Sequence, residues 1–150
     1  MQARMGNPAM VVPGAFKALG AVAQAVAATG LPPVTIELAN LRASQVNGCA
    51  VCVHMHAAGL RKAGQSDERI DTVAGWRDAP FFTDAERAAL ALAEAVTRIA
   101  DRGEAVPDDV YDEAARHYDE VQLGALLLSI ATVNVWNRIN ASTRQVAGAW

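Results

Sequence analysis

The spacing of apolar residues is helical along nearly the whole chain. No segment alternates apolar and polar residues convincingly with the period of two that is typical of a half-buried strand. Between Phe16 and Ala27, for example, the apolar residues share one face of a helix. Alanine, the best helix former, is abundant. We therefore predict an all-α fold, and the length of 150 residues favours a single domain over residues 1–150.

Breaks and capping signals divide this pattern into separate helices. We predict helices at about residues 16–27, 35–46, 49–63, 66–75, 83–101, 107–118 and 119–137. Thr83 with Glu86, and Asp119 with Gln122, have the spacing of capping boxes, in which each side chain satisfies a free backbone N–H. The last helix is nearly all apolar over residues 123–135, which predicts an element of the core or of a subunit interface.

Charge and hydropathy exclude two classes of partner. The formal net charge is −3 and no basic stripe is present, so nucleic acid is not an expected partner. The longest apolar stretch near the C-terminus, residues 124–136, is too short and contains too many polar residues to span a bilayer. One close cysteine pair gives no disulfide framework of the kind found in exported proteins. We therefore expect a cytoplasmic protein that binds neither nucleic acid nor membrane.

The segment ELANLRASQVNGCAVCVHMHAAGL, residues 37–60, contains both cysteines and two of the three histidines. Successive residues of an α-helix turn by about 100°. Cys49, Cys52 and His56 therefore lie on one face of the predicted helix, whereas His54 points to nearly the opposite side. We interpret His54 as a surface or interface histidine and the other three residues as a candidate site.

A helix that begins at residues 48–49 places both thiols in its first turn. Unpaired N–H groups and the positive end of the helix dipole stabilise a thiolate there, and a lowered thiol pKa makes cysteine nucleophilic. His56, one turn later, can take or relay the proton. Glu37 lies on the preceding predicted helix, and Asn47-Gly48 turns the chain back. If the two helices pack antiparallel, Glu37 approaches the thiols or His56 and acts as a proton acceptor.

The pattern Glu37-x11-Cys49-x2-Cys52-x3-His56 resembles the active-site signature of the AhpD-like alkylhydroperoxidases, in the carboxymuconolactone decarboxylase superfamily. The segments LRASQVNGCAVCVHMHAAGLRKAG and TVNVWNRI also resemble that family, and the resemblance covers roughly residues 15–140. The decarboxylase branch lacks the cysteine pair. The resemblance implies an all-helical fold that assembles as a trimer or hexamer, and it implies no cofactor.

The resemblance also implies a thiol peroxidase cycle that acts on small organic hydroperoxides. By this analogy Cys52 attacks the peroxide and becomes a sulfenic acid, and Cys49, at the more exposed end, condenses with it to a disulfide. An external dithiol, on a lipoyl-bearing or thioredoxin-like protein, then attacks Cys49. His56 and Glu37 form the proton relay. Some members carry a histidine directly before the second cysteine, whereas this chain has Val51.

Three other interpretations of the cysteine pair remain. The two cysteines can be small buried hydrophobic residues without a chemical role. They can form a disulfide that senses oxidation, or stabilises an oligomer, without turnover. They can also bind zinc together with His56 and Glu37, although the helix directs His54 away from such a site.

Overall fold

The structure, a computed structural model, describes residues 1–149. Over these residues the chain forms α-helices and short 3-10 helices and contains no β-strand, so the predicted all-α class is confirmed. The α-helices are α1 (Pro8–Val11), α2 (Ala15–Ala27), α3 (Pro33–Val46), α4 (Ala50–Lys62), α5 (Asp67–Asp71), α6 (Asp84–Thr97), α7 (Asp108–His117) and α8 (Glu120–Thr143). The 3-10 helices are η1 (Val73–Gly75) and η2 (Ile99–Asp101). Within the described part of the chain, no helix has both the length and the hydropathy needed to cross a membrane.

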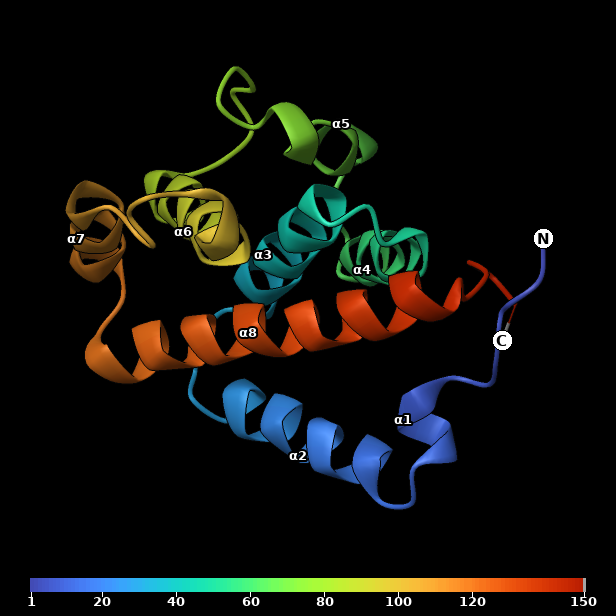
Figure 1. Ribbon diagram of the computed structural model, residues 1–150. Coiled ribbons are helices and arrows are strands. Elements are labelled where there is room, and N and C mark those ends of the chain that lie inside the picture. The colour runs from blue at the N-terminus through green and yellow to red at the C-terminus, as the bar shows by residue number, and fades with distance from the viewer. Residues whose placement is uncertain (150) are drawn as a thin grey trace.

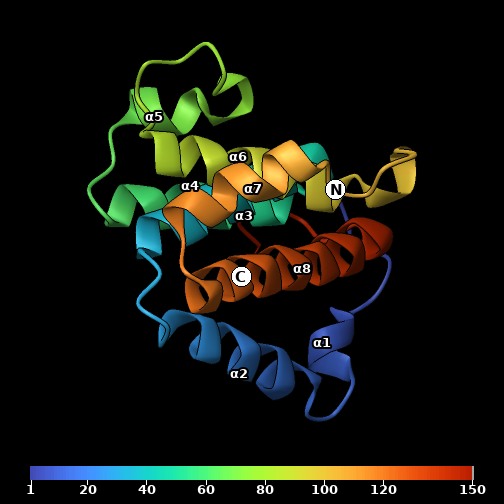
Figure 2. The ribbon, with the colours of Figure 1, turned by 90° about the vertical axis from the view of Figure 1, so that its left-hand side faces the viewer.

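The long helix α8 lies between two groups of helices. In Figures 1 and 2, α2 lies on one side of α8, while α3, α4, α6 and α7 lie on the other. Helix α3 contacts α4, α6 and α8, so it occupies the middle of the second group. The C-terminal half of α8 thereby runs past both the end of α3 and the start of α4.

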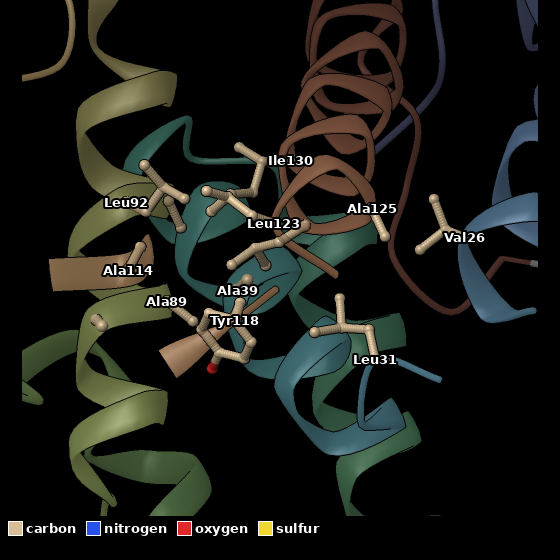
Figure 3. Close-up of a cluster of buried hydrophobic side chains, with 13 residues drawn as sticks. Val26, Leu31, Ala39, Ala89, Leu92, Ala114, Tyr118, Leu123, Ala125 and Ile130 are labelled. Carbon is tan, nitrogen blue, oxygen red and sulfur yellow. The ribbon is translucent and has the colours of Figure 1, made fainter. Parts of the chain in front are cut away.

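The main hydrophobic core joins the helices around α8 (Figure 3). Ile130 and Leu126 of α8 and Leu92 of α6 are fully buried, and Val26 of α2 packs against the same cluster from the other side. Tyr118 closes one end of the cluster and donates a hydrogen bond from its hydroxyl to the carbonyl of Ala85 over 2.7 Å. A second core cluster, which includes Leu38, Leu41 and Leu60, fixes α3 against α4.

The helix starts follow the sequence closely, and both predicted capping boxes are present, at Thr83 with Glu86 and at Asp119 with Gln122. Three of the predicted helix ends are wrong. The helix predicted over residues 66–75 stops at Asp71, and residues 73–75 form the 3-10 helix η1. Helix α6 stops at Thr97, and residues 99–101 form the 3-10 helix η2 instead. The last helix continues six residues beyond 137, because Asn140 and Thr143 are buried in the fold rather than exposed at a helix end.

The N-terminal segment lies along the end of α8. The backbone N–H of Arg4 donates to the carbonyl of Thr143 over 2.9 Å, and the side chain of Gln145 donates to the carbonyl of Met5. The sequence analysis did not predict the short helix α1, which begins after Asn7. These contacts bring Asn7 to the C-terminal turns of α8.

Candidate functional site

The two cysteines occupy the first turn of α4, as the sequence predicts. Gly48 has a φ of 66°, a left-handed conformation that glycine adopts readily, and it ends the turn from α3. Cys49 is the N-cap residue of α4, and its Sγ accepts a hydrogen bond of 3.3 Å from the backbone N–H of Cys52. The sulfur of Cys49 therefore takes the capping role that a serine or aspartate oxygen usually has.

Both sulfur-bearing side chains are buried. Cys49 is 2% exposed and Cys52 is 3% exposed, and both are free thiols. The expectation that Cys49 lies at the more exposed end is therefore wrong. Val51 forms a small buried cluster with the two cysteines, and Trp136 of α8 packs against this cluster. Cys49 at the N-cap is therefore as well shielded from solvent as Cys52 inside the helix.

Glu37 and His56 meet across the interface between α3 and α4. Nδ1 of His56 lies 2.8 Å from Oε2 of Glu37, and their side chains are 18% and 32% exposed. Gly59, one turn after His56, makes room for this pair, since a Cβ at that position would lie 2.9 Å from Oε2 of Glu37. Packing of the two helices thus confirms the predicted approach of Glu37 to His56.

The structure separates His54 from this site. His54 is exposed, whereas His56 on the opposite face is partly buried, as the helical spacing predicts.

Among residues 1–149, no three histidine, cysteine, aspartate or glutamate side chains are grouped so that they could hold a metal ion. The arrangement of Cys49, Cys52, His56 and Glu37 therefore does not support the zinc interpretation.

Asn140 of α8 is a site residue that the sequence analysis missed. Its side-chain nitrogen donates a hydrogen bond of 3.3 Å to Sγ of Cys52. Asn7 fixes which end of the Asn140 side-chain amide faces the sulfur. Its Oδ1 accepts from the backbone N–H of Ala9, so its amide group must donate, and it donates to Oδ1 of Asn140 over 2.8 Å. With its oxygen occupied by Asn7, the amide of Asn140 presents N–H to the sulfur.

Asn140 belongs to a row of buried amides on α8. Asn134, Asn137 and Asn140 recur every third residue and are all at least nine-tenths buried. The side chain of Asn47, which ends α3, donates to Oδ1 of both Asn134 and Asn137, over 2.9 and 2.8 Å. Asn137 in turn donates to the hydroxyl of Ser44 over 3.0 Å. This network fixes α8 against the turn that precedes the cysteines.

The environment shifts the pKa values of the two thiols in opposite directions. A hydrogen bond from the Cys49 thiol is the main cause that lowers the pKa of Cys52, to about 6. Burial opposes this change, while hydrogen bonds from Asn140 and Asn137 and the charge of His56 favour it. The same hydrogen bond to Cys52, together with burial, raises the pKa of Cys49 well above its usual range. At neutral pH the site can therefore hold a Cys52 thiolate beside a neutral Cys49 thiol.

Comparison with known proteins places this geometry in a family. The profile of the carboxymuconolactone decarboxylase family matches residues 13–95, which include Glu37, both cysteines and His56. The chain belongs to the carboxymuconolactone decarboxylase family. The family match, together with a structural neighbour proposed to be an antioxidant defence protein AhpD, identifies it as an AhpD-like member of the superfamily.

Two bacterial proteins similar in sequence to this chain are uncharacterized. The protein YdfG of Bacillus subtilis (strain 168) is 42% identical over 106 residues, which are 71% of this chain and 71% of YdfG. The protein YnjA of Escherichia coli (strain K12) is 31% identical over 112 residues, which are 75% of this chain but only 60% of YnjA. These relatives do not supply an activity.

Solved structures of other proteins share the fold. ATU0492 from Agrobacterium tumefaciens, a protein of unknown function proposed to be an antioxidant defence protein AhpD, is 37% identical. It superimposes with a TM-score of 0.90 over 99% of this chain and 100% of its own. The debrominase Bmp8 has a TM-score of 0.78 at 24% identity, over 91% of this chain and 73% of Bmp8. That similarity concerns the fold alone, and it shows that the fold can carry an enzyme.

Proposed function

We propose that the protein is a thiol-dependent peroxidase that reduces small organic hydroperoxides through Cys52 and Cys49. One observation carries this proposal: the Cys52 sulfur receives hydrogen bonds from Cys49 and Asn140, which lower its pKa to about 6. Such a thiol is largely a thiolate at neutral pH, and the thiolate is the nucleophilic form of cysteine. The AhpD-type antioxidant role proposed for ATU0492 agrees with this chemistry.

In the first step the Cys52 thiolate attacks the terminal oxygen of the hydroperoxide. A sulfur–oxygen bond forms, the oxygen–oxygen bond breaks, and Cys52 becomes a sulfenic acid while the peroxide is reduced. The leaving alkoxide takes the proton that Cys52 gave up, and the product is an alcohol. His56 lies one turn along the same helix face and is oriented by Glu37 at 2.8 Å, so this pair is the proposed carrier of that proton.

In the second step the Cys49 thiol attacks the sulfur of the Cys52 sulfenic acid. A disulfide forms, the sulfur–oxygen bond breaks, and the released hydroxide combines with the Cys49 proton to give water. The raised pKa of Cys49 keeps that proton in place until this step. An external dithiol, on a lipoyl-bearing or thioredoxin-like protein, then exchanges with the disulfide and restores both thiols while it becomes oxidised itself.

We further infer that the protein forms a homo-oligomer, either a trimer or a hexamer. Several large apolar side chains are exposed on α1, α2 and α8, among them Met10, Phe16, Leu128 and Val135. Exposed apolar residues that gather on neighbouring elements are typical of association surfaces. Sedimentation of the purified protein measures the subunit number, and a monomer at micromolar concentration would contradict this inference.

Steady-state turnover tests the proposed activity. The reduced protein receives cumene hydroperoxide and an excess of dihydrolipoamide, and consumption of the peroxide is followed over time. We expect many turnovers per subunit, a Cys49–Cys52 disulfide in protein trapped without reductant, and no turnover in the Cys52→Ser variant. Cys49→Ser should still be oxidised once, to a sulfenic acid at Cys52 that a dimedone probe labels.

The same assay addresses the redox-sensor alternative. A sensor or structural disulfide would be oxidised once per subunit and would not recycle at a useful rate in the presence of dithiol. A single oxidation without turnover would therefore contradict the proposed peroxidase and favour the sensor. Slow oxidation of both cysteines, at the rate of a free thiol, would contradict both and leave the cysteines as buried packing residues.

A further inference from the structure

A cavity of about 340 Å³ opens beside the Glu37–His56 pair. It lies between α2, α3, α4 and α8, and its volume is at the lower end of the range for small-molecule pockets. Most of its wall is apolar and comes from Ala23, Val26, Ala27, Ile36 and Val133. Neither cysteine belongs to the lining.

His56 is one of the polar groups that the cavity offers to a ligand. The hydroxyl of Ser129 donates to Oδ1 of Asn40 over 3.0 Å, so this hydroxyl hydrogen and this amide oxygen are engaged with each other. His56 uses Nδ1 for Glu37, and its Nε2 has no protein partner among the described residues. A neutral ligand with one oxygen can therefore bind at this nitrogen. Among the described residues, the lining contains no lysine or arginine, and Glu37 would repel an anion.

Trp136 connects the cavity with the thiols. It forms part of the cavity wall, and it also packs against the cluster of Cys49, Val51 and Cys52. Phe16 of α2 holds the indole edge-on, with a ring separation of 6.1 Å and an angle of 71°. A molecule in the cavity therefore lies next to the imidazole of His56 and next to the indole, which packs against the cluster that contains the reactive sulfur.

We infer that this cavity binds the organic group of the substrate and selects neutral hydroperoxides with a compact apolar group, such as a branched alkyl or a single aromatic ring. The peroxide end lies toward His56 and the apolar group lies against α2. This inference rests on the proposed function and adds a specificity to it: hydrogen peroxide cannot use the apolar wall, and a fatty acid hydroperoxide brings a charge that the cavity does not accommodate.

Ala23 and Ala27 set the space on the α2 side. They lie one helical turn apart, so both face the cavity, and larger side chains at these positions would occupy it. Ala25, on the same helix, is exposed as Ala23 and Ala27 are, but it is not part of the lining. Leucine is a good helix former, so the same substitution at position 25 is a matched control for the effect of leucine on α2.

The kinetic test compares two substrates in each variant. The quantity measured is the ratio of kcat/KM for cumene hydroperoxide to kcat/KM for hydrogen peroxide. In Ala27→Leu we expect this ratio to fall by about tenfold or more, because the cavity loses room for the cumyl group. In Ala25→Leu we expect the wild-type ratio. Equal ratios in all three proteins would overturn the inference.

A binding measurement keeps the cavity testable if turnover is absent. The probe is 2-phenyl-2-propanol, the alcohol formed from cumene hydroperoxide, and occupancy is followed through the NMR signal of the Trp136 indole N–H. We expect saturable binding to the wild type and to Ala25→Leu, and about tenfold weaker binding to Ala27→Leu. If the alcohol binds in this way but no hydroperoxide turns over, the proposed function fails and the cavity assignment stands. If the alcohol does not bind, or binds equally to all three proteins, the cavity assignment fails.

Discussion

Asn7 holds the side-chain amide of Asn140 through a hydrogen bond of 2.8 Å, although the two residues are 133 positions apart in the chain. Asn140 then donates to the Cys52 sulfur over 3.3 Å. The N-terminal segment thus reaches the reactive thiol through one intermediate residue. Hydrogen bonds to an ionised sulfur stabilise the thiolate relative to the thiol, so both asparagines should set the acidity of Cys52.

Of the two asparagines, Asn140 should have the larger effect on the pKa of Cys52. Replacement of Asn140 by Ala removes a donor to the Cys52 thiolate, which is worth about 1.5–3 kcal/mol for a charged acceptor. We expect the pKa of Cys52 to rise by about one to two units. The pH dependence of alkylation by iodoacetamide, followed at Cys52 by mass spectrometry, measures it. Ser142→Ala, at an exposed position of the same helix turn, is the control, and an unchanged pKa in Asn140→Ala would contradict this role.

Asn7 combines two roles that a single substitution can separate. Its Oδ1 caps α1 at the N–H of Ala9, and its amide nitrogen orients Asn140. Serine retains the capping ability but is too short to reach Asn140. We therefore expect Asn7→Ser to fold normally and to raise the pKa of Cys52 by less than Asn140→Ala does. If Asn7→Ser and the wild type titrate alike, the amide of Asn140 is oriented without Asn7.

Gly59 should be required for the Glu37–His56 contact rather than for folding. A Cβ at position 59 would lie 2.9 Å from Oε2 of Glu37, and the flexible carboxylate can move away. We expect Gly59→Ala to retain or increase stability, since alanine favours the helix by about 1 kcal/mol, but to lower kcat/KM about tenfold or more.

The control for this substitution is Gly124→Ala on α8, where a Cβ meets no atom within 4 Å. It should gain helix stability and keep full activity. Thermal unfolding and peroxidase kinetics measured on both variants separate the two effects. Full activity in Gly59→Ala would mean that the carboxylate does not act through His56.

Glu94 should determine the stability of the fold in acid. It accepts hydrogen bonds from Arg42 at 2.7 Å and Trp76 at 3.0 Å and pairs with Arg77 at 2.8 Å. Burial alone would raise the pKa of Glu94, but hydrogen bonds from Arg77, Trp76 and Arg42 lower it to about 2. Because the folded pKa is below the ordinary value of 4.5, the stabilisation is complete above pH 4.5 and is lost as the pH falls toward 2.

Urea unfolding of Glu94→Gln tests this assignment. At pH 7 the variant should lose about 3 kcal/mol of unfolding free energy, because the arginines keep their charge without a carboxylate. Between pH 4.5 and 2 its stability should fall less steeply than that of the wild type. Glu113→Gln, at an exposed ion pair, should unfold like the wild type. Parallel acid curves for the wild type and Glu94→Gln would contradict the assignment.

Local sequence rules were sufficient for the parts of the site that lie close together in the chain. Cap residues and breaks placed the start of α4 at Cys49, and helical spacing put Cys52 and His56 on one face and His54 on the other. The approach of Glu37 needed only the assumption that α3 and α4 pack antiparallel, and the turn at Asn47-Gly48 supplied it.

Contacts between distant segments could not be predicted in this way. Asn140 reads in the sequence as a polar residue beyond the expected end of a helix, and nothing near it indicates that Cys52 lies within hydrogen-bond distance. Asn7 was unrecognised for the same reason, since its partner is in the last helix. The equal burial of Cys49 depends on Trp136, so its exposure could not be judged from its place at the helix end.

The most direct measurement is the alkylation rate of Cys52 in the reduced wild-type protein from pH 4 to 10, resolved from Cys49 by peptide mass spectrometry. Hydrogen bonds to the sulfur from Cys49, Asn140 and Asn137 and the charge of His56 lead us to expect a midpoint near pH 6. Cys49 should remain unreactive until far higher pH. A Cys52 midpoint at or above about 8.5, the value of a free cysteine, would show that the helix start does not activate the thiol and would remove the basis of the proposed peroxidase.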